Sequence, residues 1–274
     1  MDEVPRSETP FPSKARSIRW AVLLIATVFL AGSYLTLKNL RDTLETQATD
    51  RLTRAISHIS NENLEVRLGG IHALGRIAAN SEKDYWPIIE ILAAYVREHA
   101  AVKKSQSLKE TPRQLALDVQ AALDVIGRRK RTYKDGETQR LDLRGTDLRR
   151  ANLAGAKFAG AILSEARLEG ANLTGVRLED AILREAHLDH ANLTEAALER
   201  SFLLNASLKE AHLGAANLRE AYVGGTRFDE ADLLGADLTG AVNLTWDQIR
   251  TAKKDNRTRL PDYLRLPAPA PGAR

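Results

Sequence analysis

The sequence predicts an α+β chain in which an N-terminal transmembrane helix and a small α-helical domain precede a solenoid of short stacked segments. Three observations predict it. Residues 141–244 repeat every five positions, residues 20–37 contain no charged side chain, and residues 38–129 show the spacing of amphipathic helices. Neither a helix of period 3.6 nor a simple strand of period 2 explains a period of five, whereas identical stacked turns do.

The N-terminal segment is predicted to anchor the chain in a membrane. Residues 1–19 are polar and are expected to be disordered, and Trp20–Leu37 is just long enough for one bilayer crossing. Two alternatives stay open: a cleaved signal peptide, for which Ala31-Gly32-Ser33 supplies small residues, and a buried helix of a soluble domain. Within 15 positions, four basic residues precede the segment and three follow it, which weakly favours an inside N-terminus and an exported solenoid.

Residues 38–129 are predicted to form a small helical domain, because apolar residues recur three and four positions apart. This spacing predicts helices at 39–60, 64–79, 86–98 and 112–127. Pro87 is placed in the first turn of the third helix. Thr111 is interpreted as the N-cap of the fourth helix, with Pro112 as its first residue and Gly127 as its end. We expect the domain to cover one end of the solenoid, which would otherwise expose leucines and unpaired backbone groups.

The five-residue repeat places a large residue at the centre of each beat and a small residue two positions before it. Seventeen of the 20 centres are Leu, and 15 of the 20 small residues are Ala. Both positions face inward if alternate residues of an extended segment point the same way. Eight residues two positions after a centre are Gly, which predicts turns with positive φ. The predicted core is Leu143, Leu148, Leu153, Phe158, Leu163, Leu168, Leu173, Leu178, Leu183, Leu188, Leu193, Leu198, Leu203, Leu208, Leu213, Leu218, Val223, Phe228, Leu233 and Leu238.

The pattern Ala-Asn-Leu-x-x, seen at residues 151–153, 171–173 and 191–193, resembles that of the pentapeptide-repeat proteins. The resemblance implies a right-handed quadrilateral β-helix with four beats, or 20 residues, in each coil, so residues 141–244 would form about five coils. Residues 245–264 resemble the C-terminal cap of such proteins, and residues 265–274 are expected to be a disordered tail.

The helical segment also carries a resemblance. Residues 65–78, EVRLGGIHALGRIA, resemble a HEAT or armadillo helix, in which small residues allow close packing. Together with residues 84–100 and 119–129, this segment resembles a membrane-anchored bacterial subgroup of the pentapeptide-repeat proteins. That resemblance implies a cytoplasmic soluble part, against the weak charge bias, so the side of the membrane stays open with a lean towards the cytoplasm.

No residue pattern typical of catalysis is present. The absence of Cys excludes disulfides and Cys–metal sites. His187, His190 and His212, with Asp189, are too few and too dispersed on the coil to predict a metal site, which needs three or four convergent ligands. The basic run 128–131 could contact nucleic acid or anionic lipid, but it is also expected of a solvated linker at 130–140. We predict no enzyme activity, cofactor, metal, nucleic-acid partner or small-molecule substrate.

One outward column of the implied coil is apolar. Residues 20 positions apart lie above one another, and Ile162, Ile182, Phe202 and Tyr222 then form a column with Leu204 beside it. Contiguous exposed apolar groups usually mark interaction surfaces. Three occupants stay open: a protein partner, a second copy of the chain, or cover from the helical domain or C-terminal tail of the same chain.

These observations predict a membrane-anchored, non-catalytic scaffold for protein–protein interaction. Two other functions stay open. Some pentapeptide-repeat proteins mimic DNA and bind type II topoisomerases, and the repeat region here carries 16 acidic against 11 basic residues, but its charges alternate in sign along the stacked columns. An enzyme activity in the helical domain has no motif to support it. The sequence names neither the partner nor the oligomeric state.

Overall fold

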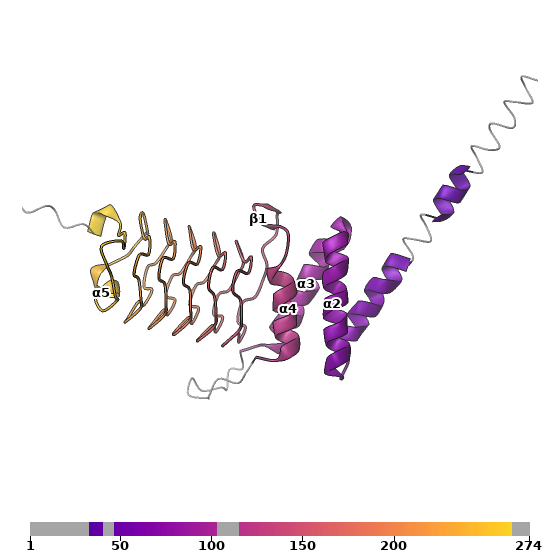
Figure 1. Ribbon diagram of the computed structural model, residues 1–274, viewed down its shortest axis with the longest axis horizontal. Helices are drawn as coiled ribbons and strands as arrows, with labels where there is room; N and C mark the ends of the chain where they lie inside the picture. Colours follow the sequence, from indigo (N-terminus) through magenta and orange to yellow (C-terminus); the bar gives the residue numbers. More distant parts are fainter. Residues whose placement is uncertain (1–32, 41–46, 103–114, 265–274) are drawn as a thin grey trace, which may run out of the picture. The chain divides into compact units, whose positions relative to one another are not determined.

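The computed structural model describes residues 33–40, 47–102 and 115–264 (Figure 1). The chain divides into two compact units, Met1–Arg54 and Ala55–Arg274. Residues 33–40 are helical, and a second helix covers residues 47–59. The predicted transmembrane segment 20–37 lies outside the described residues up to residue 32. Among the helices that are described, none is both long and apolar enough to cross a bilayer.

Three helices form the predicted helical domain: α2 (Leu64–Asn80), α3 (Glu82–His99) and α4 (Leu117–Gly127). The prediction for α2 is confirmed to within one residue. The prediction that α3 starts at residue 86 was wrong. Ser81 caps this helix by accepting a hydrogen bond from the backbone N–H of Asp84, so the helix begins at Glu82 and Pro87 lies inside it.

The fourth helix is shorter than predicted. It begins at Leu117 rather than at residue 112, its N-cap residue is Ala116, and no side chain caps it. Thr111 and Pro112, the predicted cap, lie outside the described residues. Gly127 does end the helix, but for a reason that differs from the predicted turn chemistry. A Cβ atom at Gly127 would lie 2.9 Å from the Cβ of Ala156, so glycine allows the helix end to pack on the solenoid.

The three helices pack around a small apolar core that includes Ile71, Leu74, Ile88 and Leu92, all fully buried. Glycine brings the helices close together, as the HEAT-like pattern implied. A Cβ atom at Gly75 would lie 3.0 Å from the methyl groups of Val125 on α4. The domain therefore depends on small residues at helix crossings as well as on buried leucines and isoleucines.

A buried carboxylate ties the three helices together. Asp118 Oδ2 on α4 accepts hydrogen bonds from Arg67 Nε on α2 at 2.7 Å and from the Tyr95 hydroxyl on α3 at 2.8 Å. Burial opposes ionisation of Asp118, but the hydrogen bonds from Tyr95 and Arg67 outweigh it and hold the pKa of this carboxyl below its ordinary value. Burial and the bond to Asp118 raise the pKa of Tyr95 to about 12.

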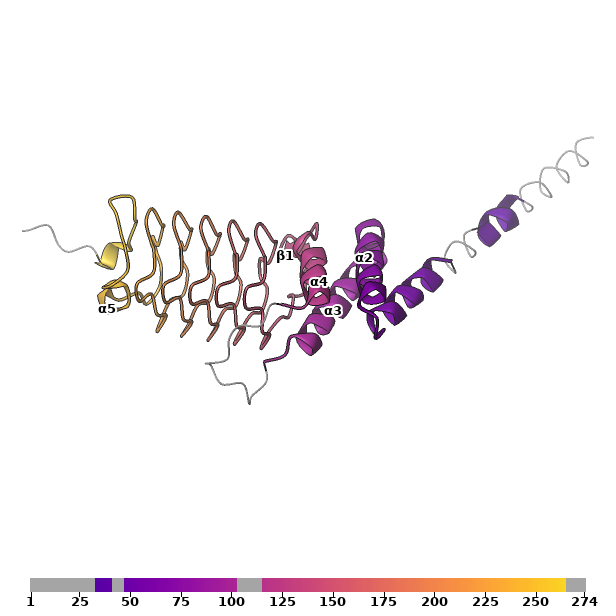
Figure 2. The ribbon, with the colours of Figure 1, turned by 60° about the horizontal axis from the view of Figure 1, so that its bottom comes forward.

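Residues 141–242 form a solenoid in which each beat makes one short side of a coil (Figures 1 and 2). Parallel bridges join residues 20 positions apart, as in the series Asp142, Ile162, Ile182, Phe202, Tyr222 and Val242. The backbone pairs in both directions: the N–H of Leu143 donates to the carbonyl of Ile162 at 2.8 Å, and the N–H of Ile162 donates to the carbonyl of Leu141 at 2.8 Å. Every beat centre from Leu143 to Leu238 is at most 2% exposed.

The corners of the coil share one backbone conformation. All 20 residues two positions after a beat centre have positive φ, between 54° and 72°. Each corner is closed by a hydrogen bond such as that from the N–H of Ala151 to the carbonyl of Leu148 at 3.0 Å. Positive φ at the third residue of such a turn is characteristic of type II turns. Glycine was expected in this role and occupies eight of the corners, but the other 12 carry side chains.

The helical domain covers the first edge of the solenoid, as predicted. Three backbone N–H groups that would pair with a preceding coil find substitutes: Asp147 donates to the carbonyl of Ala100, Asn152 to Gln120 Oε1 and Lys157 to the carbonyl of Gly127, at 2.6, 3.0 and 3.0 Å. Gln120 Nε2 also donates to the carbonyl of Asn152 at 2.8 Å. Backbone groups and side chains of the domain thus replace a missing coil.

The segment between the helices and the repeats is folded, not a solvated linker. It contains the two-residue parallel strands β1 (Thr132–Tyr133) and β2 (Gly136–Glu137). Arg140 donates to the carbonyls of Gly160 and Asp180 at 2.8 and 2.9 Å, and its guanidinium lies 3.9 Å from the centre of the Tyr133 ring. The segment is therefore part of the cap.

The far end closes with α5 (Trp246–Ile249) and an extended return that ends in the 3₁₀ turn Asp262–Leu264. Thr245 and Gln248 form a capping box, so the predicted N-cap is confirmed, although the helix is shorter than the predicted 246–254. Lys253 and Arg259 take the place of a next coil by bridging to Asp232 and Asp237. Ile249 is buried, but Trp246 is 46% exposed, so the expectation that it covers the last coil was wrong.

Replacing Asp118 by Ala should lower the free energy of unfolding by about 3 kcal/mol, because Arg67 and Tyr95 lose their shared acceptor in a buried position. The folded-state pKa of Asp118 is depressed, so its contribution is present above its unfolded pKa, near 4, and is lost as the pH falls through the folded value. Chemical denaturation at pH 7 and pH 3 measures this. Tyr95→Phe, which removes one donor only, should cost about 1 kcal/mol. An Asp118→Ala chain as stable as the parent at pH 7 would contradict the role of this carboxylate.

Two glycine corners separate backbone strain from crowding. At Gly175 a Cβ would meet nothing within 4 Å, so Gly175→Ala should cost only the strain of positive φ, about 1 kcal/mol. At Gly160 a Cβ would lie 2.3 Å from the Cβ of Tyr133, so Gly160→Ala should cost a further 1–3 kcal/mol, roughly the effect of overpacking. Thermal and urea unfolding of both variants measures the difference, and equal costs would show that Tyr133 does not pack on this corner.

Candidate interaction surface

The predicted apolar column exists as a continuous feature of one side of the solenoid. Ile162, Ile182 and Phe202 are half-buried, while Leu204 and Tyr222 are 37% and 39% exposed. Parallel bridges join each member of the column to the next one, so the side chains stack in register. The surface consists of outward groups and is separate from the inward core of Leu163, Leu183 and Leu203.

An aromatic stack forms the middle of this column. The ring centres of Phe202 and Tyr222 lie 4.7 Å apart with an interplanar angle of 5°. Val242, which was missed in the sequence because the five-residue phase breaks at residue 243, extends the column by one coil through its bridge to Tyr222. The apolar side of the solenoid therefore continues to the C-terminal cap.

Charged groups border the column at the neighbouring corner. Asp180 accepts from Arg200 Nη2 at 3.0 Å and pairs with Lys134 Nζ at 3.2 Å. Burial opposes ionisation of Asp180, but the bonds from Arg200 and Lys134 outweigh it and hold the pKa of this carboxyl below its ordinary value. The outer surface thus joins an apolar strip to a paired ionic border, an arrangement found at protein interfaces.

Most ion pairs on the solenoid run along a beat, not between coils as expected. Arg167 pairs with Glu169 at 3.2 Å, and Arg177 pairs with Glu179 at 2.9 Å, two residues further along the same side. The expected column of Glu179, Glu199 and Arg219 does not form, because Glu199 accepts from Asn217 and Arg219 pairs with Asp237. Only the Asp180–Arg200 step of the expected columns is an ion pair between coils.

The histidines singled out in the sequence stay apart from any metal-like cluster. His190 Nδ1 lies 3.4 Å from Glu210 Oε2, and both, with His212, line a polar groove of about 290 Å³ that also includes Asp232 and Lys253. Within the described ranges, no group of three or more His, Cys, Asp or Glu side chains is arranged to hold a metal ion.

The basic run at 128–131 is largely engaged within the chain. Arg129 is buried, donates to the carbonyl of Lys157 at 2.9 Å, and lies 3.6 Å from Glu137. Burial lowers the pKa of Arg129 despite Glu137, and burial raises the pKa of Glu137 despite Arg129 and Tyr85. Desolvation therefore dominates this pair. Arg131 pairs with Glu82 at 2.8 Å, which leaves little of the run for a nucleic-acid surface.

Comparisons with known proteins agree with this geometry. The family model "Pentapeptide repeats" matches residues 139–175, 171–203 and 206–242 with eight copies. A pentapeptide repeat protein from the thylakoid lumen of Arabidopsis thaliana is 32% identical, with 37% of this chain and 70% of that one covered and a TM-score of 0.36.

Two further solved structures are similar over the repeats. HetL, a pentapeptide repeat protein involved in heterocyst differentiation regulation from the cyanobacterium Nostoc sp. strain PCC 7120, is 32% identical, with 36% of this chain and 55% of that one covered and a TM-score of 0.21. QnrB1, a plasmid-mediated fluoroquinolone resistance protein, is 17% identical, with 42% and 62% covered and a TM-score of 0.26. The comparison with curated proteins found no match.

The repeat model implies a right-handed quadrilateral β-helix, in agreement with the bridges at 20-residue steps. Its eight copies cover the segment that forms the solenoid, and the helices before residue 139 lie outside the match. On this evidence the chain belongs to the pentapeptide-repeat protein family.

Proposed function

We propose that this protein is a membrane-anchored, non-catalytic scaffold that binds another protein, or a second copy of itself, through the apolar column. The observation that carries the proposal is the unbroken outward series Ile162, Ile182, Phe202, Tyr222 and Val242 on a solenoid whose other outward positions are mostly polar. These side chains are not needed to fill the interior, which Leu and Ala already fill.

The chemistry of the surface supports binding better than a DNA-like role. A DNA mimic would present unpaired carboxylates at regular spacing to a positively charged groove. Here several corner and side carboxylates are paired with arginine, including Asp180 with Arg200, Glu169 with Arg167 and Asp229 with Arg227. The neutral strip and its aromatic stack instead suit a protein surface, where aromatic groups contribute most of the binding energy.

Site-specific photo-crosslinking in cells tests the column. A benzoyl-phenylalanine residue at Leu204 should give a crosslinked product, because this side chain is 37% exposed beside the stacked aromatics. The same probe at Ala197, an outward position on another side, should give none. Adding Ile182→Glu with Phe202→Glu should abolish the product at Leu204. Equal products from both probe positions would contradict the proposal.

The double substitution should leave the fold intact, and this is its internal control. Ile182 and Phe202 are outward and half-buried, so thermal unfolding should change far less than in Leu203→Ala, where an inward side chain is lost at a cost of about 2–5 kcal/mol. A double variant as destabilised as Leu203→Ala would make the column part of the core.

The membrane anchor is tested separately. Deleting residues 20–37, a stretch of 18 residues without a charge, should move the protein from the membrane fraction to the soluble fraction, because the remaining chain lacks a comparable apolar segment. Fractionation after carbonate washing measures this. Protease treatment of intact and opened cells then gives the side on which the solenoid lies. Membrane retention of the deleted chain after the wash would contradict anchoring by this segment.

A further inference from the structure

We propose that the helical domain carries a binding site for a phosphate-bearing amphiphile, in a pocket formed by α2, α3, α4 and the residues that follow α4. The pocket has a volume of about 260 Å³. Small-molecule sites in proteins range upward from roughly 300 Å³, so this one suits a small ligand or one end of a larger ligand. It is distinct from the apolar column of the solenoid.

The floor of the pocket is apolar. Gly75 and Ala78 on α2, Ile89 on α3 and Val125 on α4 line it. Gly75 packs against Val125, which brings α2 and α4 together beneath the opening. A short alkyl or ring portion of a ligand would lose its contact with water here.

The rim of the pocket is cationic. His72, Arg76, Arg128 and Lys130 line it, and no carboxylate does. Arg76 has no ion-pair partner in the described part of the chain. Arg128 is 83% exposed and reaches Asp124 only at 3.9 Å. Arg129 also lines the pocket, but Glu137 balances its charge.

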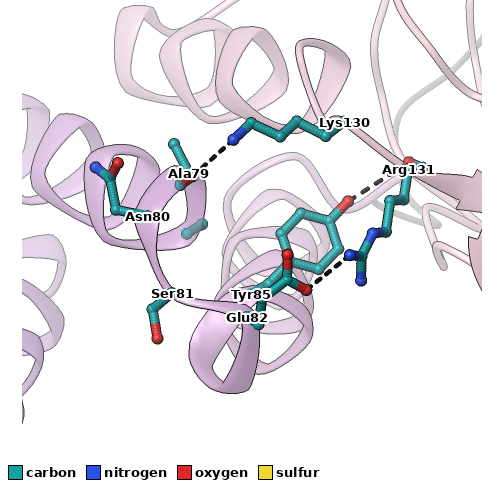
Figure 3. Close-up of a pocket in the computed structure, with 8 residues that line it drawn as sticks. Ala79, Asn80, Ser81, Glu82, Tyr85, Lys130 and Arg131 are labelled. Atoms are coloured by element: carbon teal, nitrogen blue, oxygen red, sulfur yellow. Dashed lines mark hydrogen bonds and ion pairs between the residues drawn. The ribbon is translucent and has the colours of Figure 1, made fainter.

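Lys130 completes the rim and offsets the negative end of α2. Its Nζ donates to the carbonyl of Ala79, in the last turn of the helix, at 2.9 Å (Figure 3). This bond uses one of three ammonium N–H donors and leaves two for a ligand. A smaller space of about 80 Å³ beyond this bond contains Glu82, which points to Arg131, so the cationic site is the larger pocket.

This combination fits a phosphate ester with an apolar body. Guanidinium groups bind phosphate oxygens through paired, charge-assisted hydrogen bonds, and an ammonium adds a point charge. Two arginines and a lysine around one opening match a group that carries up to two negative charges. The ligand chemistry is the same whether the phosphate belongs to a membrane lipid or to a soluble ester.

Calorimetric titration of the full chain in phosphatidylcholine nanodiscs tests the site with hexyl phosphate, inorganic phosphate and hexanol. Hexyl phosphate should bind more tightly than either of the others, and affinity should rise about fourfold for each added methylene that enters the pocket. Hexyl phosphate that binds no better than both single-feature probes would overturn the proposal.

Matched variants locate the binding. Arg76→Gln with Arg128→Gln should weaken hexyl phosphate binding at least tenfold, and Ala79→Phe, at an exposed position beside the opening, should do the same by filling it. Lys83→Gln with Arg250→Gln removes the same charge at exposed positions outside the pocket and should change nothing. Equal losses in the two double variants would show a general charge effect and overturn the site.

The source of the phosphate is read from a second arm with nanodiscs that contain phosphatidic acid. If these lipids compete with hexyl phosphate in the parent chain and not in the Arg76→Gln, Arg128→Gln variant, the site takes a membrane lipid. If hexyl phosphate binds equally in both kinds of nanodisc, the site takes a soluble ester. Both outcomes require the pocket, and both differ from a failure of the apolar column, which neither variant touches.

Discussion

Main-chain pairing between residues 20 positions apart is the constraint on which the solenoid depends. Each coil has only one bridging residue on each side, so the coils stay in register only if every corner turns by the same amount. That requirement explains why 12 residues with side chains adopt positive φ alongside eight glycines. Each costs about 1–2 kcal/mol, which the paired backbone and the buried leucines offset.

The two ends of the solenoid solve the same problem with different chemistry. At the first edge, a helical domain supplies one backbone carbonyl from a helix end, another from a loop, and the two-way amide of Gln120. At the far edge, the chain continues as an imitation of another coil, with Lys253 and Arg259 in bridging positions, and Gln248 donates to the carbonyls of Val223 and Thr226. In both places a glutamine amide stands in for a peptide group, since it offers a donor and an acceptor at similar spacing.

The interior of the solenoid could be predicted from the period of five, because a strict alternation of Ala and Leu has one packing solution. The corners were predicted only where glycine marks them, since no local signal distinguishes Glu195 or Ala215 in this conformation. The ion pairs were assigned to the wrong direction. Arg177 has Lys157 and Ala197 as its stacked neighbours, so Glu179 on the same beat is the acid within reach.

The candidate surfaces differ in the same way. The apolar column follows from spacing once the coil size is known, and only Val242 was lost where the phase slips. The pocket in the helical domain has no linear signature, because its rim combines a helix turn at residues 72–76 with residues 128–130 from beyond another helix. The 20-residue coil also fixes how such a molecule can change length. Loss or gain of one five-residue beat would turn one cap by a quarter of a revolution against the other, so only whole coils can be exchanged without moving the surfaces apart.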